Sequence, residues 1–562
     1  MLNVRPAVGL SMAVVLLAWL LPNHSPPWPS FYNEVWMAIA LLPVAVWLLL
    51  RSAQPVRLPA AAMVVATFAV VPLLQSAAGQ IHYRGDALLA TIYLLGLALC
   101  IVMGARWRDV ASGEGTHCVF TTLLLAALLS THLALLQWLR IDGLGVLLAD
   151  LPIGGRPNAN VAQANHLASL LFLGLVSIWG LYLRGDVRGG VAWLAAAYLL
   201  FGMAMTQSRT GWLEVALLAG AAVTWPQRLR SRHSWIGLLG LLAFFVSLIV
   251  LWPSINQVLL LDGGLSLTDQ VQSGKRPALW QAMAEAMWVA PWAGYGWTQT
   301  ALAQLTQAPL QPPLHVLFTY AHNLWLDLLL WNGMVLGLLA GAAIGGWFWL
   351  QLRRVRGSDE SLLFLALLGL LVHAQFEFPY AYAYFLLPAG LIAGLLPSGG
   401  RDRRLPRGAM LSIVAVLSTV TFVLGYEYVK AEAAWQRVRM EAARIRLPPA
   451  EDGGRLKWLD QLQGLIDQSR KNPKSSMTSA EQAAFRAAVE RFPGSGALYR
   501  LALMEAYQGR PAEAAKALDM LCSLNTPANC TSALNAWRIE AATNPAMLLV
   551  QPTNPGLSSS RP

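Results

Sequence analysis

A histidine, an amide and a carboxylate crowd the start of one hydrophobic run in this sequence. The stretch YAHNLWLDLLLWNGM places His322 and Asn323 directly before the apolar residues, with Asp327 about one turn later. A run that enters a membrane is expected to shed polar side chains, because each costs free energy in hydrocarbon. An imidazole can take the proton of a hydroxyl, so His322 is the first candidate for a general base.

The position of this histidine predicts its protonation state. The positive end of a helix dipole disfavours imidazolium, so a histidine at the helix N-terminus should stay neutral and able to accept a proton. Asn323 either caps the helix or orients the ring. Asp327 falls about 140° around the helix from His322, which argues against direct pairing. A purely structural histidine is the alternative for His322 taken alone.

Basic residues stand out in two further motifs. TQSRTGW places Arg209 in a very short turn among other donors, an arrangement that suits phosphate oxygens. SGKRPALWQAMAEAMWVAPWAGYGW places Lys275 and Arg276 before a predicted amphipathic helix, 277–290, whose N-terminal amides add to an anion site. A turn arginine at the membrane surface and an interfacial helix without a ligand are the alternatives.

Two more motifs, GGRPNANVAQANHLASLL and VHAQFEFPYAYAYFLLP, gather amides, rings and a carboxylate at the ends of apolar segments. Their candidate residues are Arg156, Gln163, Asn165, His166, Glu377, Tyr380 and Tyr382. The amides form a mouth suited to sugar hydroxyls, or they cap a helix and satisfy a re-entrant loop. Tyrosines at this depth are ordinary aromatic-belt residues, whereas Glu377 beside a proline has no such explanation.

The absence of several common motifs limits the reactions that the protein could catalyse. The sequence has no P-loop, HExxH or DxD pattern, and the carboxylates outside the membrane are scattered, so we expect neither a metal site nor a cofactor. An imidazole, several cations and a polar mouth suit transfer from a donor with an anionic leaving group, such as a lipid pyrophosphate, to a hydroxyl. The base would take the hydroxyl proton and the arginines would stabilise the departing phosphate.

The elements that must position these residues are membrane helices. Of the 562 residues, 56% are hydrophobic and 12% are charged, about half the usual charged fraction of a soluble domain. We predict an all-α polytopic membrane protein with about 12–13 transmembrane helices of roughly 17–25 residues and a small helical C-terminal domain. The predicted segments are 7–22, 34–50, 59–76, 87–104, 118–139, 166–183, 190–206, 211–225, 235–252, 322–350, 361–377, 380–396 and 409–428. The first is interpreted as an uncleaved transmembrane helix.

Basic residues orient these segments. With the N-terminus in the cytoplasm, the inside gaps hold 17 of the 23 Lys and Arg residues before residue 429. The six outside are Arg84, Arg140, Arg156, Arg209, Lys275 and Arg276. This orientation puts all five motifs and the C-terminal domain on the outer side, where six cations against the bias favour an anionic ligand. The basic pI reflects membrane loops, and no motif indicates a nucleic-acid partner.

The chain divides into N-terminal transmembrane helices (1–140), a transmembrane core (141–428) with a large outer loop at 253–321, a helical domain (429–545) and a disordered tail (546–562). RFPGSGALYRLALMEAYQGRPAEAAKALDMLCSL, in the helical domain, resembles a single tetratricopeptide hairpin. It either docks a protein acceptor or covers the site. Cys522 and Cys530 form a disulfide only if this domain lies in an oxidising compartment.

The five motifs, in order over about 150–400, resemble the O-antigen ligase and polymerase superfamily, most closely the bacterial protein O-oligosaccharyltransferases that glycosylate pilin. NVAQANHLASLLFLG is similar to a Gln-x-Asn-His motif, with Ala164 in place of Pro. SRTGWL and SGKRPALW…PWAGYGW look like two arginine motifs, and YAHNLWLDLLLWNGMVLGLL looks like a His-Asn helix. VHAQFEFPYAYAYFLLPAGL resembles the motif of the pilin-type branch, with Ala374 in place of Ser.

This resemblance implies a GT-C-like ligase fold and metal-independent, inverting transfer of an oligosaccharide from undecaprenyl pyrophosphate. The acceptor would be a Ser or Thr hydroxyl of a pilin-like or other periplasmic protein, at the periplasmic face of the bacterial inner membrane. His322 would be the base. Arg209, Arg276, Lys275 and Arg156 would bind the pyrophosphate, while Gln163, Asn165, His166, Asn323, Glu377, Tyr380 and Tyr382 would position the substrates.

Other functions remain as alternatives. Within the superfamily they are an O-antigen ligase acting on lipid A-core and a polysaccharide polymerase. A transporter or flippase for lipid-linked sugars predicts charges near mid-membrane and internal repeats with broken helices, whereas the polar clusters here share one face. A scaffold protein does not need cations and a histidine collected on one side.

Overall fold

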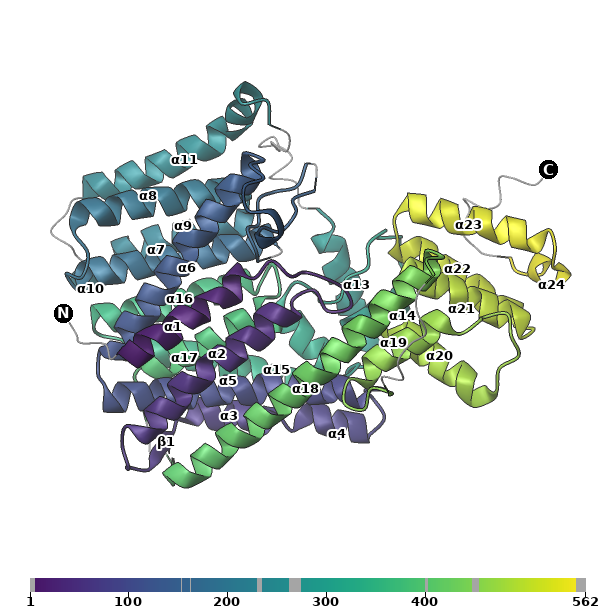
Figure 1. The fold of residues 1–562 in the computed structure, drawn as a ribbon, viewed down its shortest axis with the longest axis horizontal. Coiled ribbons are helices and arrows are strands. Elements are labelled where there is room, and N and C mark those ends of the chain that lie inside the picture. Colours follow the sequence, from purple (N-terminus) through teal and green to yellow (C-terminus); the bar gives the residue numbers. More distant parts are fainter. Residues whose placement is uncertain are drawn as a thin grey trace. The chain divides into compact units, whose positions relative to one another are not determined.

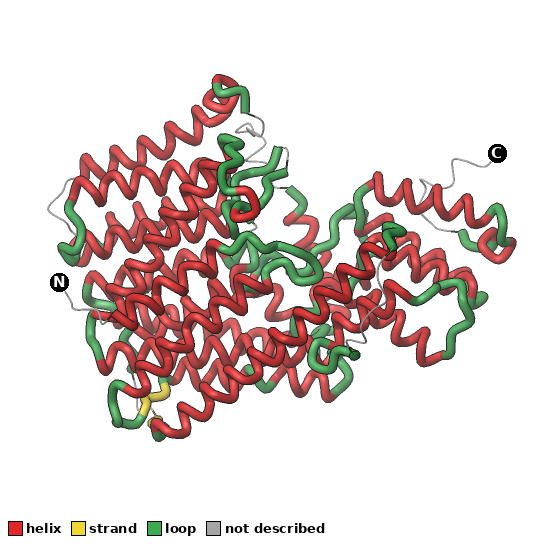
Figure 2. The backbone as a smooth tube through the Cα atoms, in the orientation of Figure 1, coloured by secondary structure: helices red, strands yellow, loops and turns green. Residues whose placement is uncertain are grey.

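Helices make up most of the chain that the structure describes. The computed structural model describes residues 6–152, 154–161, 163–229, 235–261, 274–399, 403–446 and 454–551. Its strands form one short antiparallel ribbon, in which β1 (Val56–Leu58) pairs with β2 (Arg403–Leu405) (Figure 2). Part of the predicted outer loop (262–273) and most of the predicted tail (552–562) lie outside the described residues, as do Arg5, Arg230, Arg232 and Arg401.

The described chain divides into two compact units. Unit 1 comprises Met1–Ala69, Ile92–Gln272 and Ala343–Phe422, and unit 2 comprises Val70–Thr91, Ser273–Ala342 and Val423–Pro562. The helices of unit 1 are α1 (Pro6–Leu20), α2 (Phe31–Leu50), α3 (Ala60–Phe68), α6 (Glu114–Trp138), η1 (Gly145–Leu147), α7 (Ala164–Leu183), α8 (Gly189–Thr206), α9 (Arg209–Thr224), α10 (Pro226–Leu229), α11 (Trp235–Val258), α16 (Ser358–His373), η2 (Pro379–Ala381) and α17 (Ala383–Leu395) (Figure 1).

The second unit holds short helices and the C-terminal domain. Its helices are α4 (Val71–Ala77), α13 (Arg276–Val289), α14 (Thr300–Gln307), α19 (Asp460–Arg470), α20 (Ser479–Arg491), α21 (Ser495–Tyr507), α22 (Pro511–Leu524), α23 (Pro527–Ala541) and α24 (Pro545–Leu548). Three helices contribute residues to both units: α5 (Arg84–Val110), α15 (Leu324–Arg354) and α18 (Arg407–Ala442).

Helices occupy all the predicted apolar segments. Within the described residues, nine helical stretches are long and apolar enough to cross a membrane, judged by length and composition. The remaining predicted segments coincide with α1, α9, α16 and α17, which have 13 to 16 residues. The segment predicted at 59–76 is interrupted between α3 and α4. The chain is an all-α polytopic membrane protein.

The gaps predicted to share the inner side meet at one end of unit 1. Arg51 forms an ion pair with Glu114, and Arg57 forms one with Asp109 over 3.1 Å. Arg184 pairs with Asp359 and also reaches the carbonyl oxygen of Gly113. Because β1, in the gap that holds Arg51 and Arg57, pairs with β2 in a further gap, the alternation predicted from arginine positions corresponds to a real grouping of loops.

Helix α7 is the packed centre of unit 1. It contacts α6, α8, α9 and α16 (Figure 1), and 83% of its most apolar stretch of 18 residues is buried inside the protein. Glycines allow this approach: a Cβ at Gly174 would lie 2.4 Å from that of Ala127, and one at Gly180 would lie 2.4 Å from the Phe120 ring. The N-terminus of α7 therefore has a fixed place, and it carries three of the predicted site residues.

The C-terminal domain in unit 2 contains the predicted helical hairpin. Helices α21 and α22 pack against each other, and Gly509 takes the left-handed conformation (φ 73°) at the turn between them. The packed domain extends beyond the predicted boundary at 545, because Met547 and Val550 are buried in its core. Residues 546–551 thus belong to the domain, in contrast to the disordered tail that we predicted from 546.

Candidate active site

The predicted site residues are divided between the two units. Unit 1 carries Arg156, Gln163, Asn165, His166, Arg209, Glu377, Tyr380 and Tyr382, and unit 2 carries Lys275, Arg276, His322 and Asn323. Each group forms a local arrangement that can be described by itself.

His322 lies in a loop directly before α15, not in the helix. The first helical residue is Leu324, and the Asn323 side-chain oxygen accepts a hydrogen bond from the Leu326 N–H over 3.1 Å, so Asn323 caps the helix. His322 itself has a φ of 53°, in the left-handed region that non-glycine residues rarely enter. The predicted 140° separation from Asp327 is therefore wrong, because it assumed that His322 continues the helix.

Asp327 folds back onto this loop. Its two carboxylate oxygens lie 3.0 and 3.2 Å from the backbone nitrogen of Ala321, the residue before His322. The Trp280 indole donates to the Ala321 carbonyl oxygen over 2.9 Å, so both sides of this residue are held. The His322 ring packs edge-on against Phe318 at 5.3 Å between centroids.

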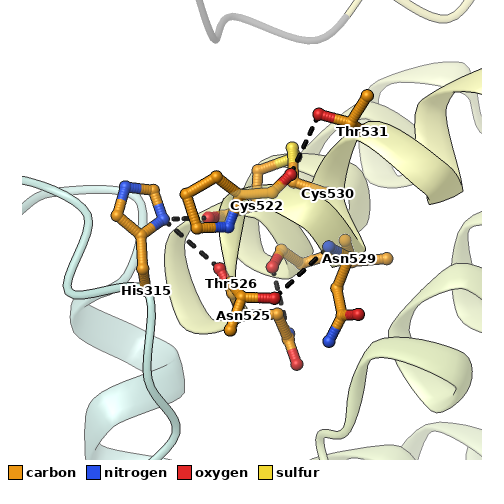
Figure 3. Close-up of a disulfide and its surroundings, with 9 residues drawn as sticks. His315, Cys522, Asn525, Thr526, Asn529, Cys530 and Thr531 are labelled. Atoms are coloured by element: carbon orange, nitrogen blue, oxygen red, sulfur yellow. Dashed lines mark hydrogen bonds between the residues drawn. A yellow bond between two sulfur atoms is a disulfide. The ribbon is translucent and has the colours of Figure 1, made fainter.

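The chain leading into this loop is also anchored. Gln304 donates to the carbonyl oxygen of Val316 over 2.9 Å and accepts from the backbone N–H of Phe318 over 2.7 Å. Further upstream, His315 donates its backbone N–H to the carbonyl oxygen of Ser523 over 2.8 Å, and its ring lies 3.1 Å from the carbonyl oxygen of Cys522 (Figure 3). Segment 315–323 is thus tied to the C-terminal domain at one end and to α15 at the other.

Lys275 and Arg276 mark the start of the predicted amphipathic helix. Helix α13 begins at Arg276 with Lys275 as its N-cap residue, and Leu279, Met283 and Ala286 are fully buried. The Lys275 side chain is exposed and Arg276 is half-buried. A cation pair at a helix N-terminus has the chemistry of an anion site.

The PWAGYGW turn after α13 packs against a break in α15. Gly333 has φ 71° and ψ 177°, so the continuous helix predicted over 322–350 is wrong at this residue. The turn satisfies the freed backbone groups: Tyr295 N–H donates to the Leu330 carbonyl oxygen, and Met334 N–H donates to that of Pro291, each over 2.7 Å. A Cβ at Gly294 would lie 2.5 Å from the Leu330 carbonyl oxygen, so this close approach requires glycine.

Glu377 joins two predicted motifs in unit 1. Its carboxylate accepts hydrogen bonds from the amides of Asn165 over 2.7 Å and Gln163 over 3.2 Å, and its side chain is buried. Gln163 is the N-cap residue of α7. The two amides hold an acid of the protein itself, so they organise the mouth by fixing Glu377.

His166 lies beneath this cluster among aromatic rings. It is buried, its Nδ1 lies 3.3 Å from the Tyr384 hydroxyl, and its ring packs edge-on against Tyr382 at 4.6 Å. Tyr382 is the N-cap residue of α17, and Tyr380 lies half-buried in the short helix η2. The structure thus brings together His166 and Tyr382, which come from two different motifs.

A second cation, Arg156, contacts the turn that carries Arg209. Arg156 donates to the carbonyl oxygen of Gln207 over 3.1 Å, and Gln207 has a positive φ of 47°. The Ser208 hydroxyl then caps α9, whose first residue is Arg209. A cleft of about 240 Å³ adjoins the turn, and its lining includes Arg140 and Gln207. Two of the predicted cations therefore lie at one turn beside a polar cleft.

Some amides of the mouth have a structural role. The Asn160 side chain donates to the carbonyl oxygens of Leu20 and Leu147 and accepts from the Ala149 N–H. Gln137 bonds the Asn158 N–H in the same loop over 3.0 Å. The side chains of Asn160 and Gln137 therefore satisfy backbone groups of this loop.

A series of hydrogen bonds between buried polar side chains links three helices of unit 1. The sequence did not reveal this arrangement. The Ser169 hydroxyl donates to Glu214 over 2.5 Å and lies 2.7 Å from Nδ1 of His373, and all three side chains are fully buried. These residues come from α7, α9 and α16. The lone carboxylate in the apolar α9 segment was the available signal, since ionisable residues inside membrane segments are rare without a partner.

This architecture defines a polytopic membrane protein with polar clusters at helix ends, and comparisons with known proteins give its family. Residues 194–341 match the family described as O-Antigen ligase, and residues 362–524 match "Virulence factor membrane-bound polymerase, C-terminal". A General O-oligosaccharyltransferase of Acinetobacter baylyi is 31% identical over 429 residues, covering 74% of each chain. A ComP-specific O-oligosaccharyltransferase of the same organism is 25% identical, covering 67% of this chain and 69% of the relative.

The chain belongs to the O-oligosaccharyltransferase group of the O-antigen ligase family, as the five motifs predicted. It is accordingly an enzyme, a membrane glycosyltransferase, which sets aside the transporter and scaffold alternatives.

Proposed function

We propose that this enzyme moves an oligosaccharide from undecaprenyl pyrophosphate to a Ser or Thr hydroxyl of a pilin-like or other periplasmic protein. The single observation that carries the assignment of the base is the loop around His322. Its left-handed backbone and the hydrogen bonds on both sides of Ala321 give a histidine in a costly, closely supported conformation. Such conformations cluster at functional sites.

The proposed reaction is a metal-independent, inverting displacement. The acceptor hydroxyl oxygen attacks the anomeric carbon of the first sugar while His322 takes the hydroxyl proton. The bond from that carbon to the phosphate oxygen breaks, and the lipid pyrophosphate leaves with the electron pair. Arg209 and Arg276 stabilise the charge on the leaving group, assisted by Arg156 and Lys275.

The remaining predicted residues have positioning roles in this proposal. Glu377, held by Gln163 and Asn165, presents a fixed polar surface to the substrates at the mouth of α7. His166, Tyr380 and Tyr382 surround that mouth with ring edges and polar tips, which suit sugar hydroxyls and apolar sugar faces. Asn323 fixes the start of the helix that follows the base.

The proposed location is the periplasmic side of a bacterial inner membrane. Two observations support it. The predicted inner gaps, which are rich in arginine, gather at one end of unit 1. Cys522 and Cys530 form a disulfide in the C-terminal domain (Figure 3), and disulfides persist in oxidising compartments such as the periplasm.

A reconstituted transfer assay tests the proposal. Purified enzyme receives an undecaprenyl-pyrophosphate-linked oligosaccharide with either a pilin-like protein or lipid A-core as acceptor. We expect a glycan mass shift on the protein, which His322→Ala abolishes and His82→Ala, a change at an exposed surface histidine, leaves intact. Transfer to lipid A-core alone would instead establish the O-antigen ligase alternative, and the family match over 194–341 is compatible with either acceptor. Substantial transfer by His322→Ala would remove His322 as the base.

A further inference from the structure

The residue pair Asp327 and Ala321 forms a clamp across the start of α15. The carboxylate reaches back over the helix cap and engages the Ala321 N–H with both oxygens, at 3.0 and 3.2 Å. Helix α15 is one of the long apolar helices, and Asp327 is fully buried within it. A buried carboxylate in such a helix calls for a role.

The clamp is built from more than one bond. Thr300 donates its hydroxyl to the Asp327 carboxylate over 2.7 Å, and the Trp331 indole donates to the Thr300 oxygen over 2.8 Å. Thr300 and Asp327 are fully buried, and Trp331 is nearly so. The carboxylate is therefore fixed by α14 on one side while it holds the loop on the other.

The clamp acts next to a residue with a strained backbone conformation. Ala321 directly precedes His322, whose φ of 53° persists only when surrounding contacts determine it. The Asp327 carboxylate fixes the N–H side of Ala321, and the Trp280 indole fixes the carbonyl side, which is the peptide bond shared with His322. Movement of either contact changes where the imidazole sits.

We propose that Asp327 is a positioning residue, which holds the left-handed backbone at His322 and so places the base against the acceptor hydroxyl. This inference rests on the proposed function, because it assigns Asp327 an effect that passes through His322. The carboxylate takes no proton from the substrate in this role. Thr300 belongs to the same device, since it orients the carboxylate.

Kinetics of purified variants test the clamp. Asp327→Asn should lower kcat about 100-fold, the scale of a misplaced catalytic group, with KM for both substrates within about twofold of wild type. The acid limb of the pH profile of kcat should persist while the plateau falls, because the proposed base is still present. An acid limb that disappears would instead identify Asp327 as the proton acceptor and overturn the proposal.

Three further variants separate positioning from general destabilisation. Thr300→Val should lower kcat in the same direction, whereas Thr300→Ser, which keeps the hydroxyl, should restore most of it. Glu427→Gln is the matched control, because this buried carboxylate of unit 2 accepts the backbone N–H groups of 457–459 and lies outside the proposed site. It should lower thermal stability while kcat per folded enzyme stays at the wild-type value.

The outcomes distinguish this inference from the proposed function. Wild-type kcat in Asp327→Asn, with His322→Ala inactive, would overturn the clamp alone. An active His322→Ala would overturn the base assignment and the clamp together. Equal losses of kcat per folded enzyme in Asp327→Asn and Glu427→Gln would reduce Asp327 to a stabilising residue and also reject the proposal.

Discussion

The Glu377 carboxylate accepts a hydrogen bond from the Asn165 amide over 2.7 Å, between residues 212 positions apart in the chain. This contact fixes the start of α7 to the segment between α16 and α17. It joins two of the motifs that were recognised separately in the sequence. The amide and the carboxylate are similar in size and can be exchanged between the two positions.

Exchange of donor and acceptor tests this contact. Glu377→Gln and Asn165→Asp should each cost about 1–3 kcal/mol of stability, because each leaves a buried polar group without a suitable partner. The double variant Asn165→Asp/Glu377→Gln restores one donor and one acceptor, so it should recover part of both stability and transfer. Thermal unfolding in detergent and the transfer assay measure this. A double variant as damaged as the sum of the singles would show that the two residues act independently.

Substitution of Arg209 tests whether the proposed contact with the pyrophosphate depends on paired hydrogen bonds or on positive charge alone. Arg209→Lys keeps the cation but loses the planar fork of donors, so kcat/KM for the lipid-linked donor should fall about 10- to 100-fold. Arg228→Lys, at a cation stacked on Trp225 in a predicted inner gap, is the control and should leave kcat/KM unchanged. Wild-type kinetics in Arg209→Lys would remove Arg209 from the pyrophosphate site.

The disulfide should affect both stability and transfer. Cys522 and Cys530 are eight positions apart, and closing so short a loop stabilises a fold by about 2–3 kcal/mol in the chain-entropy view. Reduction should also loosen the carbonyl groups that bind His315, and with them the loop leading to His322. We expect dithiothreitol to lower kcat severalfold in wild type.

Two variants control the reduction experiment. Cys522→Ser/Cys530→Ser should resemble the reduced enzyme and no longer respond to dithiothreitol. Cys100→Ser/Cys118→Ser removes the two buried free thiols and should respond like wild type. A C-terminal reporter that reads as cytoplasmic, or Cys522 and Cys530 found reduced in cells, would contradict the periplasmic location.

An ion pair inside unit 2 gives a stability prediction. Arg491 binds Asp86 through two hydrogen bonds, of 2.7 and 2.9 Å, and Asp86 is buried. Asp86→Asn leaves the half-buried Arg491 guanidinium poorly paired, which should destabilise the protein by about 1–3 kcal/mol. Asp86→Asn/Arg491→Met removes both charges and should be less destabilised than the single change. Thermal unfolding of the full chain measures this, and equal melting of the two variants would argue that the pair contributes nothing specific.

Hydrophobicity and arginine placement predicted much of this fold. Long apolar segments become helices in a membrane protein because their backbone groups must be satisfied internally, and all the predicted segments are helical. Motif resemblance correctly indicated the family. The break at Gly333 escaped prediction because glycine is common in membrane helices. Only the packing of the PWAGYGW turn against it distinguishes this glycine from others in α15.

The details of the site depended on contacts that no local pattern carries. The left-handed backbone at His322 is set by Asp327 and Trp280 from outside the loop, so the sequence alone suggested a helical position. Ser169, Glu214 and His373 come from three helices and are up to 204 positions apart. Sequence pattern identifies such residues singly, and their partners become known only with the tertiary structure.

The break at Gly333 changes what the two parts of α15 must do. Met334 to Arg354 contains 21 residues, a length of about 31 Å, which alone matches the hydrocarbon thickness of a bilayer. The nine residues from Leu324 to Asn332 therefore need not be as apolar as a membrane span requires. For this reason α15 can carry Asp327 and Asn332 within three turns of its start, with both side chains buried in protein.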